Sequence, residues 1–335
     1  MRTAVMVGVL VFCAGVVWAQ EEKPDKAMEE AVKKACEWLL KQQKPDGHWE
    51  YNTQGPFRLN LTLFDGSTAL VLLALLKGGI DPDHPAIKKG FEYLRKQPLR
   101  YTYSVSCYIL ALDALYEARH KKRMKKKSKK KSHTTVLADD YDPRKDTRRW
   151  APADLKRLRE LVDWLVKNRT NGRVWRYPPS GEDASNTQYA MLALSVALRR
   201  GIPVPDEVFI NVAKYFLECQ EKDGPEVKWF PVPAADKSFR ELRKIKKEII
   251  RQIKRIERKY KDEEYKKGMR TTVIEEARDK IFGGEKKKMY ARGWCYMYND
   301  TEGALWRKVI TGAMTASGVA ALCVCKKALE GKPVW

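Results

Sequence analysis

Four apolar segments of this chain begin with clusters of polar side chains that could line a binding pocket. Ligand pockets are mostly apolar and carry a few placed polar groups. Asp, Ser, Thr and Asn also cap helix starts by accepting hydrogen bonds from free amide groups, and capping alone would explain any single residue. The clusters are residues 65–68 (DGST), 103–104 (YS), 183–188 (DASNTQ) and 311–315 (TGAMT). The candidate ligand-binding residues within them are Thr68, Tyr103, Asn186, Gln188, Thr311 and Thr315.

Tryptophans in the turns before these segments form a second set of candidates, namely Trp49, Trp175 and Trp294. An aromatic-lined cavity can hold apolar groups, and its ring faces can stabilise a cation. The same indoles could instead pack between neighbouring helices, because large aromatic side chains dominate cores. For the indole that directly follows each Gly, we favour packing.

The segments around these residues are predicted to be helices that come in pairs. The first helix of each pair is amphipathic and charged, at residues 26–43, 84–97, 152–168 and 206–220. The second is nearly all apolar or small, at residues 66–78, 103–118, 184–199 and 311–327. A helix that is apolar on all faces must be buried on all sides, so the second helices form an inner layer. No alternating strand pattern is present. The sequence therefore predicts an all-α fold, an α/α hairpin repeat solenoid or partial α/α toroid.

One stretch, residues 38–49 (WLLKQQKPDGHW), shows the repeated unit most clearly. It reads as a helix end, a Gln, a Pro-Asp-Gly turn and then an indole. The unit recurs imperfectly at residues 164–175 and 215–229, and residues 292–294 look like a displaced second half. A Gln followed by Gly-x-Trp resembles the QW repeat of squalene and terpenoid cyclases and of protein prenyltransferase subunits. The resemblance covers most of the chain outside two charged insertions and implies an α/α toroid.

The resemblance also implies chemistry that the chain matches poorly. Squalene cyclases protonate an alkene with a D-x-D-D motif, which is not found here; Asp65 and Asp183 are the remaining candidate acids, by position only. Zinc prenyltransferases need Asp, Cys and His around one ion, and none of the four histidines stands at a fitting inner-helix position. We therefore predict no metal and no other cofactor.

The first 19 residues are typical of a secretory signal peptide, with Arg2 before an apolar run and a cleavage site near Ala19. The run is short for a membrane span, and an uncleaved anchor is the alternative. The mature protein, residues 20–335, is therefore expected to be exported, in the periplasm, the cell envelope or the medium. Six cysteines follow the signal. Their spacing gives no disulfide framework, and buried free thiols are the expected outcome.

Two insertions carry most of the formal net charge of +23. Residues 119–149 begin with a dense run of Lys and Arg, and because like charges repel, we expect disorder or a solvated extension. Residues 236–288 read as helical instead. Their apolar residues follow steps of three and four and give one stripe on a charged helix; the stripe comprises Leu242, Ile245, Ile249, Ile253, Ile256 and Tyr260.

Three functions are compatible with these patterns. The first is a non-catalytic protein that binds an apolar or isoprenoid ligand, or a partner protein, in an inner-helix cavity. The second is an active cyclase or prenyl transferase with a non-standard acid. The third is an interaction protein that docks on an anionic surface or polyanion through its basic insertions. Specific nucleic-acid recognition is not expected, because aromatic interleaving and a reader motif are missing from the sequence.

Overall fold

The computed structural model describes residues 26–50, 64–128, 150–177, 182–228, 239–282, 288–297 and 308–332. The chain forms two compact units. The repeat unit comprises residues 24–219 and 294–329, and the segment 220–293, which we call the arm, belongs to the other unit together with the chain ends. The predicted signal segment 1–19 lies outside the described residues.

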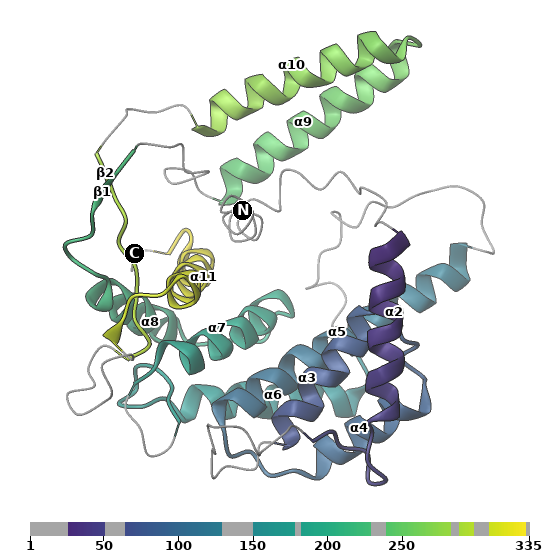
Figure 1. Cartoon of the computed structure of the whole chain (residues 1–335), viewed down its shortest axis with the longest axis vertical. Helices are drawn as coiled ribbons and strands as arrows, with labels where there is room; N and C mark the ends of the chain where they lie inside the picture. The colour runs from purple at the N-terminus through teal and green to yellow at the C-terminus, as the bar shows by residue number, and fades with distance from the viewer. Residues whose placement is uncertain are drawn as a thin grey trace. The chain divides into compact units, whose positions relative to one another are not determined.

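The repeat unit is built from alternating outer and inner helices, as the sequence predicts (Figure 1). The outer helices are α2 (Lys26–Lys41), α4 (Pro85–Lys96), α6 (Pro152–Lys167) and α8 (Asp206–Cys219). The inner helices are α3 (Phe64–Lys77), α5 (Thr102–Ser128), α7 (Ala184–Arg199) and α11 (Gly312–Leu329). The predicted all-α hairpin repeat fold is therefore confirmed.

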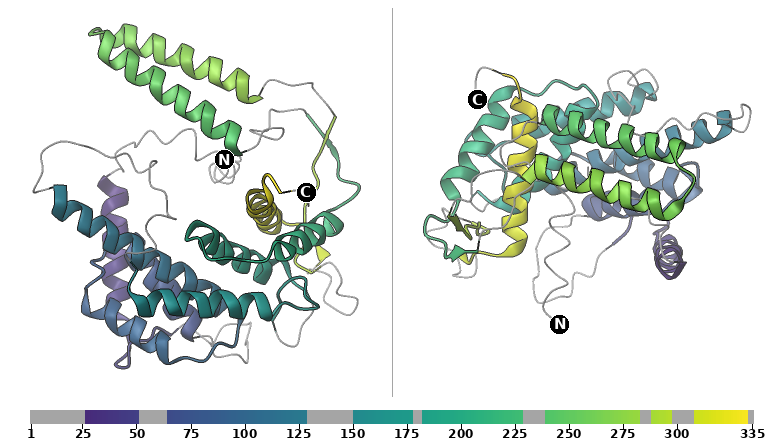
Figure 2. Two further views of the ribbon diagram at one scale, coloured as in Figure 1. Left: turned by 180° about the vertical axis from the view of Figure 1, so that it is seen from behind. Right: turned by 90° about the horizontal axis from the view of Figure 1, so that it is seen from above.

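The inner helices pack on one another in chain order, α3 on α5, α5 on α7 and α7 on α11. Each buries small and branched apolar residues, such as Leu72 on α3, Ile109 on α5 and Leu194 on α7. The outer helices α4 and α6 cover α3 and α5, and α8 covers α11 (Figure 2). Among the described helices, α11 is long and apolar enough to cross a membrane by length and composition. Its contacts with α7 and α8 instead give it the place of an inner helix.

Three buried tryptophans join the layers through the same pair of hydrogen bonds. Each indole Nε1–H donates to a carbonyl at the end of an outer helix, and each Trp backbone N–H donates to a threonine Oγ1 in the next inner helix. The indole bonds are Trp49 to Leu39 (2.7 Å), Trp175 to Leu165 (2.9 Å) and Trp294 to Phe216 (2.6 Å). The backbone bonds are Trp49 to Thr68 (3.0 Å), Trp175 to Thr187 (3.3 Å) and Trp294 to Thr315 (3.3 Å). The last carbonyls of a helix lack their usual partner within the helix. The indoles supply hydrogen bonds to them, and the Leu39 carbonyl accepts a second one from the Gln42 backbone N–H at 3.1 Å.

The third tryptophan comes from a distant part of the chain. Phe216 lies on α8, whereas Trp294 follows the arm, so the arm is inserted between the two halves of one repeated unit. The expectation that residues 292–294 are a displaced second half is therefore correct. The sequence pattern instead ended this unit at Trp229, which lies outside the described residues; Trp294 makes the contacts that Trp49 and Trp175 make in the other units.

A glycine on α11 allows the close approach of this third indole. A Cβ built on Gly318 would lie 2.7 Å from a ring carbon of Trp294, whereas one built on Gly312 of the same helix meets nothing within 4 Å. Gly318→Ala should therefore lower the free energy of unfolding by about 1–3 kcal/mol through overpacking. Gly312→Ala should leave it unchanged or raise it slightly, because Ala is the better helix former. Urea denaturation measures both values, and equal effects of the two changes would contradict this account.

The arm contains a helical hairpin and a short two-stranded sheet. Helices α9 (Phe239–Lys259) and α10 (Glu263–Phe282) lie side by side, so the helical character expected of residues 236–288 is observed in the described part (Figures 1 and 2). Of the predicted apolar stripe, Ile245, Ile249 and Ile253 are half-buried on α9 and Ile256 is buried, as are Val273 and Ala277 on α10. Strands β1 (Glu226–Val227) and β2 (Met289–Tyr290) pair antiparallel. Two residues are too few for a sequence pattern to reveal them.

Helix α5 extends farther than the expected boundary at residue 118. It continues to Ser128, through the first part of the lysine run, and residues 129–149 lie outside the described part. Carboxylates from neighbouring segments offset the repulsion between the cations. Arg119 bonds Asp154 at 2.9 Å, and Lys122 bonds Asp81 at 2.6 Å and Asp83 at 2.7 Å.

Candidate functional site

The starts of α3 and α5 bring the first predicted acid into contact with a serine. The Ser104 hydroxyl donates to the Asp65 carboxylate at 2.9 Å. A Cβ on Gly66 would lie 2.9 Å from the same hydroxyl oxygen, so the absence of a side chain at Gly66 permits the contact. The cavity that Asp65 and Ser104 border measures about 10 Å³. This is the room needed by about one water molecule, and it offers no space for an apolar ligand.

An aromatic pair joins α5 to α7 at the same end of the inner layer. The rings of Tyr103 and Tyr189 lie 4.5 Å apart, with a 60° angle between their planes. Burial, followed by the neighbouring Cys107 thiol, raises the pKa of Tyr103 well above its ordinary range. Burial likewise raises the pKa of Cys107 to about 12, so this thiol stays protonated at neutral pH. The site is therefore an uncharged polar contact between two helices.

The second predicted acid caps the next inner helix. Asp183 is 1% exposed, and its carboxylate accepts hydrogen bonds from the Asn186 backbone N–H at 2.6 Å and the Asn186 side-chain amide at 2.9 Å. This is the N-cap arrangement, which satisfies a free amide of the first turn. Burial raises the pKa of Asp183 to about 6, and the bonds from Asn186 oppose that rise.

The raised pKa of Asp183 predicts a pH dependence of stability. Because the folded pKa of about 6 exceeds the ordinary 3.8, protonation favours the folded state. This contribution is complete below pH 3.8 and is lost as the pH rises through 6, at a cost of about 3 kcal/mol. Asp183→Asn keeps the cap and removes the titration. The variant should therefore match the wild type near pH 4 and exceed its free energy of unfolding above pH 6.

Urea denaturation of both proteins across this pH range measures the difference. A difference that stays constant with pH would show that Asp183 does not titrate in the folded state with a raised pKa.

The remaining predicted residues lie at their expected helix starts but serve mainly local structure. Thr68 and Thr315 accept the tryptophan backbone bonds described above. Thr311 is exposed, and its hydroxyl oxygen accepts from the Met314 N–H at 3.2 Å, which caps α11. Gln188 is half-buried on α7. The structure thus brings together Asp65 with Ser104, and Tyr103 with Tyr189, while ligand binding by these residues and by the tryptophans stays a prediction. Within the described ranges, no three His, Cys, Asp or Glu side chains are grouped as metal ligands would be.

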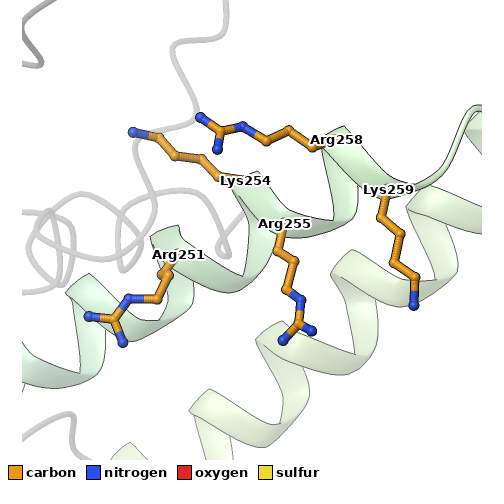
Figure 3. A pocket seen from close by; sticks show the side chains of 5 residues that line it. All are labelled: Arg251, Lys254, Arg255, Arg258 and Lys259. Atoms are coloured by element: carbon orange, nitrogen blue, oxygen red, sulfur yellow. The ribbon is translucent and has the colours of Figure 1, made fainter.

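A different site lies on the arm, within the basic insertion 236–288, although the sequence did not indicate which of its residues would form it. Five basic side chains of α9 line one recess of about 500 Å³. They are Arg251, Lys254, Arg255, Arg258 and Lys259. In the view of Figure 3, Lys254 and Arg258 leave the helix on one side, and Arg251, Arg255 and Lys259 leave it on the other. The apolar stripe that contains Ile249 and Ile256 lies toward α10, so the charged residues occupy the remaining faces of α9.

Comparison with known proteins gives the family of the chain. The model of the A-macroglobulin TED domain, a thioester-containing domain, matches residues 3–194, which is more than half of the 335 residues. The chain belongs to this family. No curated protein and no solved structure matches the chain. The match ends within α7, so α8, the arm and α11 lie beyond it.

Membership of the TED-domain family corrects the resemblance drawn from the sequence. The assignment to squalene and terpenoid cyclases or protein prenyltransferases is wrong, although the α/α toroid-like architecture agrees. The reason lies in what the repeated residues do. Gln43 donates to the Gly47 and Ala86 carbonyls, both at 2.9 Å, and the indole of Trp49 caps α2. Helix hairpins that pack in layers need such hydrogen bonds whatever reaction the protein performs. The repeated Gln and Gly-x-Trp therefore indicate the architecture and do not identify an activity.

The TED-domain family also bears on location. Its members include the extracellular macroglobulins, which agrees with the export expected from the N-terminal segment.

Proposed function

We propose that this protein is an exported binding protein that holds a linear acidic polysaccharide on the basic side of α9. The observation that carries the proposal is a recess whose described lining residues are five cations. Residues 251–259 of a helix span about 12 Å at 1.5 Å per residue. Five positive charges are therefore concentrated along a short length of helix, which suits a polymer with repeated negative charges.

The charges in this recess are poorly neutralised within the protein. Among the described residues, no carboxylate lies within 4 Å of Lys254, Arg255 or Arg258, and Arg251 bonds only Glu248, at 2.7 Å. By contrast, Glu257 on the same helix is held by Arg270 at 2.6 Å and by Lys266 at 3.5 Å, both from α10. The basic side of α9 thus keeps its positive potential. A cluster of one sign attracts polyanions and gains free energy from the counterions that they release.

Packing against α10 orders the helix that carries these cations. Ile256 is buried, the less exposed Ile249 lies on the same side of α9, and Val273 of α10 is buried in the hairpin. Ion pairs of Arg270 and Lys266 with Glu257 add links between the two helices. A helix that is already ordered loses less entropy when it binds, so its affinity is higher than that of a disordered basic segment.

An acidic polysaccharide fits the recess better than the other polyanions. None of the five lining side chains that the structure describes is aromatic, so these side chains offer no ring on which the bases of a single-stranded nucleic acid could stack. A flat lipid surface would engage exposed cations generally, whereas a recess admits a narrow chain between side chains. The export predicted from the N-terminal segment would bring the protein into contact with polysaccharides of the cell envelope or the medium.

A covalent function through a thioester has little support in the described residues. A thioester is an acyl group bound to a cysteine sulfur, so it needs a reachable thiol. Five of the six described cysteines are buried: Cys36, Cys107, Cys219, Cys295 and Cys325. Burial raises the pKa of each, so the nucleophilic thiolate is disfavoured. Of the two predicted acids, Asp65 accepts a hydrogen bond from the Ser104 hydroxyl, and Asp183 caps α7. The proposal is therefore for binding without a covalent step.

Binding to three classes of polyanion tests the proposal. Fluorescence anisotropy would be measured with a labelled sulfated oligosaccharide, a single-stranded oligonucleotide and vesicles that contain anionic lipid. We expect saturable binding of the oligosaccharide, with a slope of log affinity against log salt of about −3 or steeper, since each contacting cation releases about one counterion. Preference for the oligonucleotide or the vesicles would reassign the partner. Absence of binding to all three would refute the proposal.

A further inference from the structure

The chain leaves the repeat unit after α8 and re-enters it at Trp294, and the two connecting segments run antiparallel. The Glu221 N–H donates to the Gly293 carbonyl at 3.0 Å, and the Ala291 N–H donates to the Pro225 carbonyl at 2.9 Å. Gly224 is required for this approach, since a Cβ there would lie 2.0 Å from the Ala291 carbonyl oxygen. Between these two bonds the first segment spans four residues and the second spans two, so the register shifts before the pairing continues into β1 and β2.

Each of the two connecting segments is flanked by a cysteine at the end where it joins the repeat unit. Cys219 is two residues before Glu221, and Cys295 is two residues after Gly293. The Glu221–Gly293 hydrogen bond lies two residues from each cysteine and holds the two connecting segments together at this end. A second bond lies close to the cysteines, because the Trp294 Nε1–H donates at 2.6 Å to the Phe216 carbonyl in the last turn of α8, which ends at Cys219.

The two thiols share one buried environment. Cys219 is 7% exposed and Cys295 is 9% exposed. Burial raises the pKa of Cys219 to about 12, and the Cys295 thiol adds to this rise, which places the two sulfurs within electrostatic reach of each other. Burial also raises the pKa of Cys295. In the folded protein both groups are therefore protonated and shielded, so a reaction between them belongs to the folding stage.

We propose that Cys219 and Cys295, which are thiols in this structure, join as a disulfide when the exported chain folds in an oxidising compartment. The two thiols lose two protons and two electrons as the sulfur–sulfur bond forms. The disulfide of an oxidant, such as a thiol oxidoreductase or oxidised glutathione, accepts the two electrons and two protons and is reduced to two thiols. Export provides the compartment in which such bonds persist.

The bond would close a loop that contains the whole arm. Both α9 and α10 lie between residues 219 and 295, so the two ends of the arm would be covalently joined where it leaves the repeat unit. The other four described cysteines, Cys36, Cys107, Cys323 and Cys325, lie within helices α2, α5 and α11. This proposal concerns folding and stability, and it does not depend on the partner of the basic recess.

Peptide mapping tests the proposal on the wild-type chain. The denatured protein would be refolded in a glutathione redox buffer, alkylated under denaturing conditions, digested and analysed by mass spectrometry with and without reduction. We expect one cross-linked peptide pair, 219 with 295, that is lighter by two hydrogens than the free peptides, while the other four cysteines are alkylated. Complete alkylation of all six described cysteines, or a bond from Cys219 to another residue, would overturn the assignment.

A matched pair of variants adds a second readout. Cys325→Ser should leave the cross-linked pair intact, whereas Cys295→Ser should leave Cys219 fully alkylated. A protease nick within the arm gives a third readout, because the two fragments of the wild type should migrate together without reductant and separate with it. If Cys295→Ser does not fold, the wild-type map and the nicked protein still decide the question, and fragments that separate without reductant would contradict the bond.

Discussion

Replacing Lys254, Arg255 and Arg258 together by glutamate should lower the affinity for a sulfated oligosaccharide about 100-fold at low salt. Each basic side chain near an anionic partner contributes about 1 kcal/mol, and each 1.4 kcal/mol corresponds to a tenfold change in affinity. The loss of three positive charges alone therefore accounts for about two orders of magnitude. Fluorescence anisotropy at several salt concentrations measures the affinity. The slope against log salt should also fall by about 3, because three fewer counterions are released.

A matched variant separates the position of the charges from their number. Lys33, Lys96 and Lys214 are exposed on outer helices of the repeat unit. Their triple replacement by glutamate changes the net charge of the protein by the same amount. We expect it to weaken binding only a few-fold, through the long-range field. Equal losses in the two triple variants would mean that net charge, rather than the recess on α9, determines binding.

The largest effect on stability is expected for Trp175→Ala. The side chain is fully buried, and its Nε1–H donates to the Leu165 carbonyl at 2.9 Å. Truncation leaves a cavity between outer and inner helices and an acceptor without its partner, at a cost of about 3–5 kcal/mol in the free energy of unfolding. Trp175→Phe keeps most of the volume and should cost about 1–2 kcal/mol, mainly through the lost hydrogen bond.

An exposed tryptophan provides the control. Trp38 on α2 is 61% exposed, so Trp38→Ala should change the free energy of unfolding by about 0.5 kcal/mol or less. Chemical denaturation followed by circular dichroism gives all three values. If Trp175→Ala were no more destabilising than Trp38→Ala, the tryptophans would not be the links between the layers.

Hydrophobic periodicity was sufficient to predict the helices of the repeat unit. The predicted inner segment 184–199 coincides with α7, and the predicted outer segment 152–168 exceeds α6 by one residue. The reason is physical: a helix buried on all sides has no polar face, whereas its outer neighbour has one. The polar residues at the starts of the inner helices also lie where the sequence predicted them. Asp183 and Thr311 cap their helices, which is the simpler of the two roles considered for such residues.

Other features depend on contacts between distant segments, which a local pattern does not contain. Like-charge repulsion predicted disorder or a solvated extension from residue 119, and the described part continues as helix α5 to Ser128, with Lys122 held by Asp81 and Asp83. The third repeated unit is completed by Trp294 across the whole arm. The proximity of Cys219 to Cys295 depends on the two connecting segments of the arm. The repeated Gln and Gly-x-Trp pointed to the wrong family because they stabilise the layers and take no part in a reaction.

The central claim is that a polyanion binds at the recess on α9, and lysine acylation with and without a bound sulfated oligosaccharide tests it most directly. Reactivity at each lysine would be quantified by mass spectrometry. We predict strong protection of Lys254 and Lys259, which line the recess, and unchanged reactivity of the exposed Lys33, Lys96 and Lys214. Protection confined to the lysine run after residue 119, with Lys254 and Lys259 as reactive as in the free protein, would contradict the account.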